Sequence, residues 1–228
     1  VYKRQRSHSV SLSADLYHTF GKVQTNLLVE GFYTILDDVF ALRDMDDAAD
    51  GGKVKERYNG SGATVRGFNV EGRAAFTRWF ELQAGVTLQQ SRYKEPEFWS
   101  EDAEVPPGRR MFRTPDAYGY FTASFKPVRN FTADLSGTCT GSMLVQHMAG
   151  SGVGQDVAVS TPSFFDMNIR LSYDVRIYKE ITMQLYGGVQ NLFNAYQKDF
   201  DKGVDRDSGY IYGPSLPRSW FVGAKFSF

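Results

Sequence analysis

The chain has 228 residues with 26 basic and 26 acidic side chains, so its formal net charge is zero and there is no basic excess that would point to a nucleic-acid partner. The single cysteine, Cys139, excludes an intrachain disulfide framework, and no apolar run is long enough to form a transmembrane helix. The mean hydropathy is negative, but a membrane β-barrel with polar residues at every second strand position gives a similar value, so composition does not exclude one.

Apolar and polar residues alternate with period two along much of the chain, which is typical of β-strands with two different faces. Nine segments show this pattern, at 10–20, 26–35, 68–76, 80–89, 119–125, 131–139, 165–175, 181–189 and 220–228. Strands that cross a bilayer need about 9 to 11 residues when tilted by about 45°. We therefore expect the apolar positions to face lipid and the alternate positions to face a lumen. The charged residues expected in that lumen are Glu30, Glu71, Arg73, Glu81, Asp134, Asp166, Arg170 and Asp174.

The connections between these segments alternate between short and long. The short ones lie at 21–22, 77–78, 126–130 and 177–180, and the long ones at 37–62, 94–116, 146–162 and 195–214. Aromatic residues crowd the short turns, as in the periplasmic girdle of an outer-membrane barrel. A soluble β-sandwich also shows alternation, but its strands usually have about 5 to 6 residues and its loops lack this asymmetry. The sequence predicts an all-β protein, a transmembrane antiparallel up-and-down β-barrel in the bacterial outer membrane.

The C-terminal third contains GGVQNLFNAYQ at 187–197 and DRDSGYIYGPSLPRSWFVGAKFSF at 205–228. These segments, together with 113–127, 140–147 and 163–175, resemble the end of TonB-dependent outer-membrane receptors, most of all those of the Bacteroides group. The resemblance implies a barrel of about 22 strands plugged by an N-terminal domain. The nine strands here would be the C-terminal portion, covering 1–228, with the plug and the earlier strands absent. The start at Val1, without an initiator Met or signal peptide, agrees with a fragment.

The same resemblance implies active import of a scarce, large nutrient, which would be an iron-siderophore, haem or cobalamin complex. Energy would come from the TonB complex through the missing N-terminal part, and a surface lipoprotein is a possible further partner. The last strand, with Trp220, Phe226 and Phe228, would carry the signal for the barrel assembly machinery. A passive porin-type channel and an adhesive or structural barrel are the alternatives.

The long connection at 94–116 carries candidate ligand-binding residues. Trp99, Arg109, Arg110 and Arg113 offer an aromatic face and guanidinium groups, which suit a flat or anionic ligand such as a metal chelate or a corrinoid. Alternatively, these side chains pack the loops together or contact the phosphates of lipopolysaccharide.

Acidic residues gather in two other long connections. Asp44 and Asp46 lie beside a Gly-Gly pair, while Asp199, Asp201 and Asp205 alternate around Gly203. Carboxylate oxygens are the ligands that Ca²⁺ prefers, so either group is a candidate structural Ca²⁺ site, although neither has EF-hand spacing. The alternative is a pair of solvated acidic loops.

No catalytic constellation is recognisable in the sequence. His8, His18 and His147 are far apart in the strand pattern, and Cys139 falls on the predicted lipid face without a histidine partner. We therefore expect no enzymatic activity and no cofactor other than Ca²⁺.

Overall fold

The computed structural model describes residues 3–45, 54–102, 104–150, 152–214 and 216–228, with the backbone alone described at 41–45 and 54–55. This part of the chain forms fourteen β-strands. None of it forms a helix that is long and apolar enough to cross a membrane.

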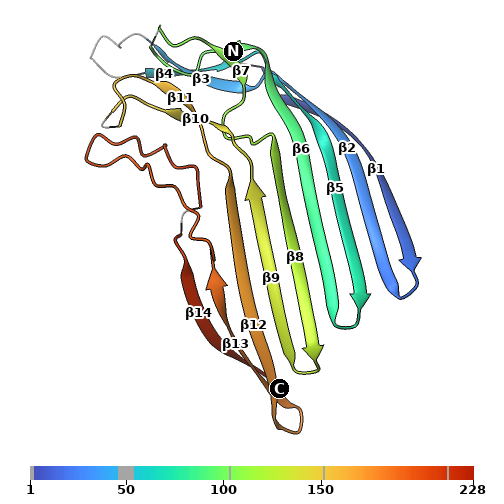
Figure 1. Cartoon of the computed structure of the whole chain (residues 1–228). Coiled ribbons are helices and arrows are strands. Elements are labelled where there is room, and N and C mark those ends of the chain that lie inside the picture. Colours follow the sequence, from blue (N-terminus) through green and yellow to red (C-terminus); the bar gives the residue numbers. More distant parts are fainter. Residues whose placement is uncertain (1–2, 46–53, 103, 151, 215) are drawn as a thin grey trace.

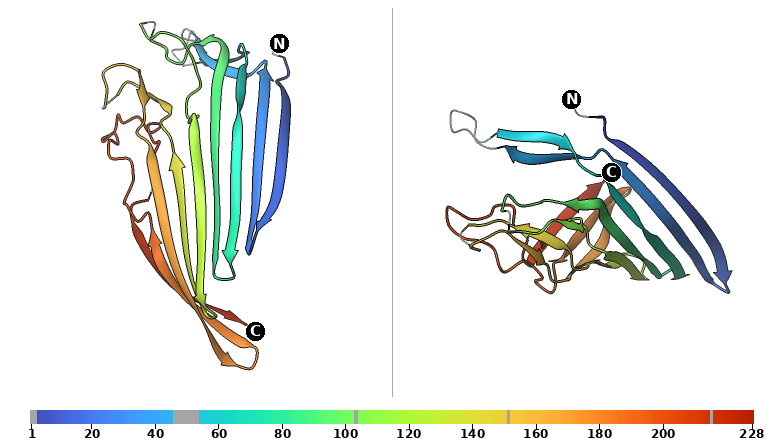
Figure 2. Two further views of the ribbon diagram at one scale, coloured as in Figure 1. Left: turned by 45° about the vertical axis from the view of Figure 1, so that its right-hand side comes forward. Right: turned by 90° about the horizontal axis from the view of Figure 1, so that it is seen from above.

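Nine long strands form one antiparallel sheet in which every strand pairs with its neighbours along the chain, apart from short insertions. The nine are β1 (Arg6–Phe20), β2 (Val23–Asp37), β5 (Ala63–Thr77), β6 (Phe80–Glu97), β8 (Ala117–Val128), β9 (Phe131–Thr140), β12 (Phe164–Tyr178), β13 (Ile181–Gln190) and β14 (Ser219–Ser227). Figures 1 and 2 show them side by side in a curved sheet. Each corresponds to one of the segments predicted from alternation, so the all-β, up-and-down antiparallel expectation is confirmed.

The strands near the N-terminus extend further than the alternation predicted. β1, β2 and β5 have 15 residues each, and β6 has 18. Apart from a few at the tight-turn end, such as 23–25 of β2, the additional residues of these strands lie at the end with the long loops, where apolar side chains give way to polar ones on the sheet face. The backbone ladder nevertheless continues there, as far as the pair Arg6 and Asp37. Because hydrogen bonding does not require an apolar face, alternation underestimates these strands.

Tight turns and long loops lie at opposite ends of the sheet, as predicted (Figure 1). At the tight-turn end, Gly21 has a positive φ of 62°, which lets β1 reverse into β2 with little steric cost. At the other end the long loops contain short strands that the sequence pattern did not predict. β3 (Phe40–Met45) pairs with β4 (Val54–Asn59), β10 (Leu144–His147) pairs with β11 (Val157–Ser160), and β7 (Gly108–Arg110) pairs with β6.

The two faces of the sheet differ as the alternation predicted. On one face, cross-strand partners are apolar, as in the row Val29, Val70 and Val86. Large side chains on this face are left uncovered: Leu12 is 82% exposed and Val222 is 91% exposed. Cys139, which pairs with Phe165, lies on the same face. We call this face the outer face.

The opposite, inner face carries the polar and charged positions. Glu30, Asn69 and Thr87 form one cross-strand row of it. Arg73 forms an ion pair with Glu81, and Gln184 links Arg170 to Asp174 through hydrogen bonds of 3.2 and 2.9 Å. The guanidinium of Arg170 also lies 4.6 Å from the ring centroid of Tyr186. These charged side chains of the inner face therefore have local partners on neighbouring strands.

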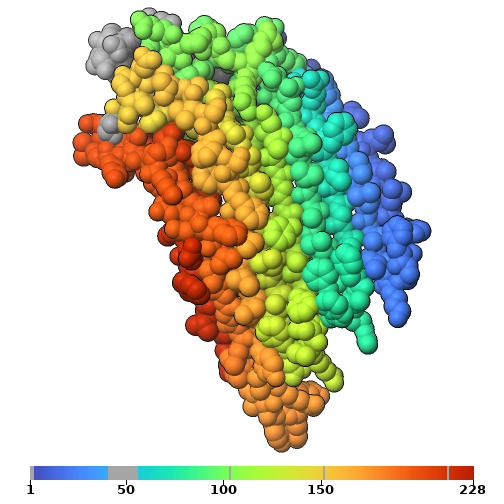
Figure 3. All heavy atoms as spheres, viewed as in Figure 1, coloured from blue at the N-terminus to red at the C-terminus, as the bar shows by residue number. Residues whose placement is uncertain are grey.

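Within the described residues, β1 and β14 are the two edges of the long sheet, and each has one neighbour in it. The sheet is an arc of wall rather than a closed cylinder. Figure 3 shows that its strands pack into a continuous surface with the loops massed at one end.

Candidate functional site

Several of the most buried side chains lie among the long loops. Val145, Gln197, Tyr210 and His147 are 0%, 1%, 3% and 6% exposed. They belong to two connections, at 141–163 and 191–218. The connection at 98–116 is hydrogen-bonded to the first of these through Trp99 and Ser100, and we call the described residues of all three the loop cluster. A sheet with one face to lipid and one to a lumen has no core of its own, so the loop cluster is the compactly packed part of this chain.

His147, at the end of β10, forms the centre of the loop cluster. Its Nε2 lies 3.0 Å from each carboxylate oxygen of Asp201, and its ring stacks on Tyr210 with centroids 3.7 Å apart and planes 7° apart. The side chains of His147 and Asp201 are 8% and 5% exposed. Asp201 also accepts a hydrogen bond of 3.1 Å from the backbone N–H of Asp207. The hydrogen bond from His147 holds the pKa of Asp201 below its usual range.

Two tyrosines share one carboxylate in the same loop. Tyr210 and Tyr212 donate their hydroxyl protons to Asp199, at 2.8 and 2.6 Å. Desolvation raises the pKa of Asp199, but the hydrogen bonds from Tyr212 and Tyr210 outweigh it and lower that pKa overall. Desolvation, with the Asp199 carboxylate second, raises the pKa of Tyr210 to about 12 and raises that of Tyr212 as well. At neutral pH this arrangement holds one anion and two neutral phenols.

The motif Asn191-Leu192-Phe193-Asn194 closes β13, and the structure gives it a physical role. Asn191 has a positive φ of 49°, and its side-chain amide donates to the carbonyls of Ala195 and Leu216, both at 2.9 Å. The Asn191 amide oxygen also accepts the N–H of Ala195 at 2.8 Å. Asn194 accepts the N–H of Arg218 at 2.9 Å. Through these hydrogen bonds the two asparagines hold the start and the end of the 191–218 loop together.

Among the predicted ligand-binding residues, Arg113 contacts other loops. Its guanidinium donates to the carbonyl of Ile211 at 2.7 Å and to that of Gly209, while its N–H donates to Leu144 at 2.8 Å. Its positive φ of 57° places it at a sharp bend. These contacts are of the kind that the loop-packing alternative expects, and a role of Arg113 in ligand capture stays a prediction.

The other three predicted ligand-binding residues lie on the same connection. The ring of Trp99 meets Phe112 edge to face at 5.2 Å, and its carbonyl accepts a hydrogen bond from Gln146 at 3.3 Å. Arg109 pairs with Glu95 at 3.0 Å and Arg110 pairs with Asp116 at 2.7 Å. Trp99 therefore contacts a second loop of the cluster, whereas Arg109 and Arg110, on β7, pair with acids 14 and 6 residues away in the sequence. A role of Trp99, Arg109 and Arg110 in ligand capture stays a prediction.

The candidate Ca²⁺ residues are dispersed. Asp46 and the side chain of Asp44 lie outside the described residues. Asp199 and Asp201 already accept hydrogen bonds from tyrosines and from His147, and Asp205 is exposed. In the described ranges no group of three or more His, Cys, Asp or Glu residues could hold a metal ion. Binding of Ca²⁺ stays a prediction.

Of the residues predicted as an assembly signal, Trp220 and Phe226 lie on β14 and Phe228 follows its end. They are 77%, 52% and 93% exposed. Trp220 and Phe226 pair with Val189 and Met183, which places them on the outer face. Their recognition by the assembly machinery stays a prediction.

Two cavities open where the loop cluster meets the sheet. One, of about 570 Å³, is lined by Phe164, Phe193, Tyr196, Lys198 and Tyr212, among others. The second, of about 310 Å³, lies on the inner face and shares Phe164 and Tyr212 with the first. The aromatic walls of the first cavity and its Lys198 ammonium suit an aromatic ligand with negative charge, and the Asp199 carboxylate, which accepts the Tyr212 hydroxyl, also lines this cavity.

The second cavity also contains an unsatisfied acceptor. It is lined by Thr138, Thr140 and Asp166, and one oxygen of Asp166 is buried without a hydrogen-bond partner. Buried acceptors normally have partners, so this oxygen can receive a donor from a bound group.

Sequence reasoning missed His147, Gln197, Tyr210 and Tyr212 as members of one site. His147 was treated as isolated, because its partner Asp201 is 54 residues away along the chain. The only sequence signal was the dense run of Tyr and Asp after the Asn191–Asn194 motif.

Comparison with known proteins decides the family. The sequence model described as "TonB dependent receptor-like, beta-barrel" matches residues 2–192. The chain belongs to the TonB-dependent receptor family. This confirms the resemblance and the outer-membrane location, and it agrees with the expectation that the chain is not an enzyme. The finer resemblance to the Bacteroides group stays a prediction. Comparison with curated protein sequences gives no match.

Solved structures of this family share the fold at low identity. The closed form of the ferric-catecholate import receptor Fiu from Escherichia coli K12 matches with a TM-score of 0.65 and 18% identity, over 98% of this chain and 28% of that one. The copper transporter OprC matches with a TM-score of 0.61 and 14% identity, over 97% of this chain and 31% of that one. A variant of the ferric enterobactin receptor PfeA from Pseudomonas aeruginosa matches with a TM-score of 0.61 and 14% identity, over 96% of this chain and 31% of that one. The TonB-dependent receptor chain described here thus spans less than a third of each of them.

Proposed function

We propose that this chain is the C-terminal part of a receptor that imports an iron chelate across the outer membrane. Family membership supports a transporter, and two of the similar structures are described as receptors for ferric-catecholate and ferric enterobactin. One of the similar structures is described as a copper transporter, so a complex of another metal is an alternative cargo. Haem and cobalamin complexes remain the alternative large cargoes.

The observation that carries the proposal is the aromatic cavity at the mouth of the wall. The cavity of about 570 Å³ is formed by the first residues of β12 and by the loop that follows β13. Lys198 supplies a positive charge beside Tyr196 and Tyr212. Ferric chelates of the catecholate type carry several aromatic rings and a net negative charge, so their rings stack on these walls and the Lys198 ammonium attracts their charge.

We further propose that the full receptor has an N-terminal plug and earlier strands, and that it contacts the TonB complex through that part. This chain matches only 28% and 31% of the two similar iron receptors, so each receptor is more than three times as long as the part that matches. Two open sheet edges also require further strands, because unpaired backbone groups are costly in lipid. A passive porin would need no such plug.

Binding of candidate cargoes to the full-length receptor tests this proposal. We expect a ferric catecholate to bind, and Lys198→Gln to weaken it about fivefold, since one cation near an anionic ligand contributes about 1 kcal/mol. Lys202→Gln, a change of the same kind in the same loop but outside the cavity, should leave affinity unchanged. Preferential binding of haem or cyanocobalamin, or equal effects of the two variants, would reject the iron-chelate assignment.

A further inference from the structure

The outer face of β1, β2, β5 and β6 changes from apolar to basic over three successive cross-strand rows. The first row contains Leu12, Gly31, Phe68 and Leu88; the second contains Val10, Tyr33, Arg66 and Gln90; the third contains His8, Ile35, Thr64 and Arg92. Successive rows on one face are about 7 Å apart, so the whole change occupies about 14 Å. Such a gradient is typical of the boundary between the hydrocarbon and the head groups of a bilayer.

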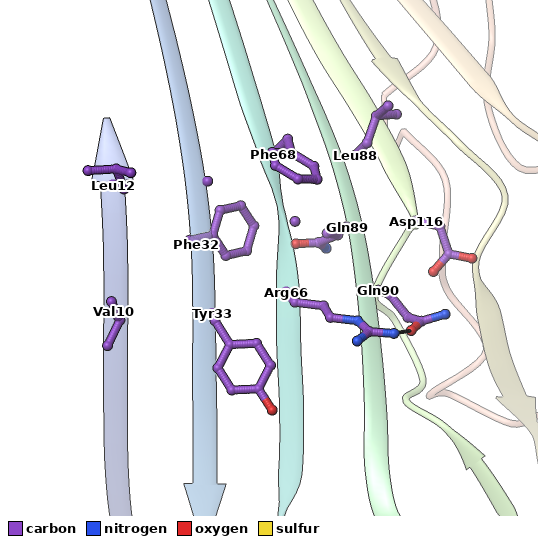
Figure 4. Close-up of a pocket in the computed structure, with 12 residues that line it drawn as sticks. Val10, Leu12, Phe32, Tyr33, Arg66, Phe68, Leu88, Gln89, Gln90 and Asp116 are labelled. Atoms are coloured by element: carbon purple, nitrogen blue, oxygen red, sulfur yellow. Dashed lines mark hydrogen bonds between the residues drawn. The ribbon is translucent and has the colours of Figure 1, made fainter. Parts of the chain in front are cut away.

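A hollow spans the first two rows. It has a volume of about 620 Å³, and Leu12, Gly31, Tyr33, Arg66, Phe68 and Leu88 are among the residues that line it. Figure 4 shows the apolar side chains on one side and the Arg66 guanidinium reaching toward Gln90, to which it donates at 2.9 Å. Leu12, Phe68 and Leu88 are 82%, 64% and 56% exposed. The hollow is therefore apolar on the membrane side and cationic on the loop side.

The positive charge at this hollow is not neutralised by the nearby acids. In the described part of the chain, Arg66 bonds to the neutral amide of Gln90, and neither Arg66 nor Arg92 forms an ion pair. Asp116 borders the hollow but is paired with Arg110 at 2.7 Å. Asp37 is paired with Lys94. The two guanidinium groups are thus available to an anion.

We infer that this hollow binds an anionic, phosphate-bearing lipid of the surrounding membrane. The acyl chain lies over Leu12, Phe68 and Leu88, and the phosphate is held by Arg66 and Arg92. Positions diagonal across neighbouring strands are about 7 to 8 Å apart, so two long arginine side chains reach one phosphate. Guanidinium groups bind phosphate through paired hydrogen bonds, and the Tyr33 ring lies at the depth where tyrosine is enriched. Gly31 lines the hollow beside the Phe68 ring, which would lie at van der Waals distance, 3.4 Å, from a Cβ at this position.

Native mass spectrometry of the full-length receptor in detergent tests this site. The probes are phosphatidylglycerol and a neutral galactolipid with the same acyl chains, added at equal concentration. We expect phosphatidylglycerol to be retained preferentially. Each interfacial arginine contributes about fivefold, so the variant R66Q/R92Q should lower that preference by at least about tenfold.

Two controls separate the site from a general effect of charge or folding. R66K/R92K keeps the charge and should retain most of the preference, while K202Q/R206Q, in the loop cluster, removes the same charge elsewhere and should have no effect. Heat-modified gel mobility shows whether each variant is a folded barrel. Equal loss in R66Q/R92Q and K202Q/R206Q, unchanged binding in R66Q/R92Q, or a dimer that covers this face would overturn the inference. None of these results depends on which cargo the receptor carries.

Discussion

The ring of His147 lies flat on Tyr210 at a centroid distance of 3.7 Å, while its Nε2 contacts Asp201 at 3.0 Å. These contacts join the β10–β11 hairpin to the loop between β13 and β14. Ser100 adds a third loop through its hydrogen bond of 2.6 Å to Asp156, which directly precedes β11 in the same hairpin. The loops therefore form one packed unit at the mouth of the wall, and a ligand meets them together.

Replacing His147 should loosen the loop cluster. In His147→Ala the stacking surface on Tyr210 is lost and Asp201 keeps a buried oxygen with fewer donors. We expect backbone amides at 199–210 to exchange hydrogen about tenfold faster, the loss of about one net hydrogen bond. Hydrogen-exchange mass spectrometry of the full receptor measures this. His8→Ala, at an exposed position on β1, is the matched control, and equal exchange in the two variants would contradict the described packing.

Arg113 should matter more for the loops than Arg109. The guanidinium of Arg113 holds the carbonyls of Ile211 and Gly209, whereas that of Arg109 forms an exposed ion pair with Glu95. Exposed pairs contribute about 0 to 1 kcal/mol. Limited proteolysis should therefore cut the 191–218 loop faster in Arg113→Ala than in Arg109→Ala. The reverse order would show that Arg113 does not act as a tie between loops.

High pH should open the loop cluster. The pKa of Tyr210 is raised from 10.0 to about 12, so its neutral form is favoured in the folded state. A group with a raised pKa contributes stability that is complete below the unfolded value and is lost as pH rises through the folded value. We expect loss of loop protection between pH 10 and about 12, followed by tyrosinate absorbance. In Asp199→Asn the titration should begin at lower pH, because the adjacent anion is gone; an unchanged curve would contradict the contact.

Low pH should also weaken the loop cluster, because Asp199 and Asp201 become protonated. The pKa values of Asp199 and Asp201 are both lowered, by hydrogen bonds from the tyrosines and from His147 respectively. Carboxylates with a depressed pKa stabilise the fold above their ordinary value, about 3.9, and lose that contribution as pH falls through the depressed one. Loop protection measured by hydrogen exchange should thus be constant from neutral pH to about pH 4. A loss already near pH 6 would contradict it.

The two faces of the sheet should respond differently to an added charge. Val86 lies on the outer face between Val70 and Gly119, whereas its neighbour Thr87 lies on the inner face between Asn69 and Tyr118. A Lys on the lipid face near the midplane costs about 2 to 4 kcal/mol. Val86→Lys should therefore shift the urea folding transition in lipid vesicles much more than Thr87→Lys. Similar shifts would argue against the assignment of the faces.

The alternation of apolar and polar residues predicted the sheet because successive residues of each strand face lipid and the aqueous lumen in turn. The placement of Val29, Val70 and Val86 on one face follows from that rule alone, without knowledge of contacts between distant parts of the chain. The loop cluster could not be predicted in the same way. β10 has 4 residues, too few to show a period, and its His147 is held by Asp201 and Tyr210 from a loop more than 50 residues away. The contact of Arg113 with the 191–218 loop could not be predicted either, because its partners are the backbone carbonyls of Gly209 and Ile211, which leave no side-chain signal.

The most direct test of the account is uptake of a radiolabelled ferric catecholate by cells that produce the full-length receptor, with the proton-motive force intact or collapsed. We predict accumulation that requires the proton-motive force and falls in Lys198→Gln but not in Lys202→Gln. Accumulation that persists after collapse would indicate a passive channel. Absence of uptake, with energised uptake of haem or cyanocobalamin instead, would contradict the iron-chelate assignment.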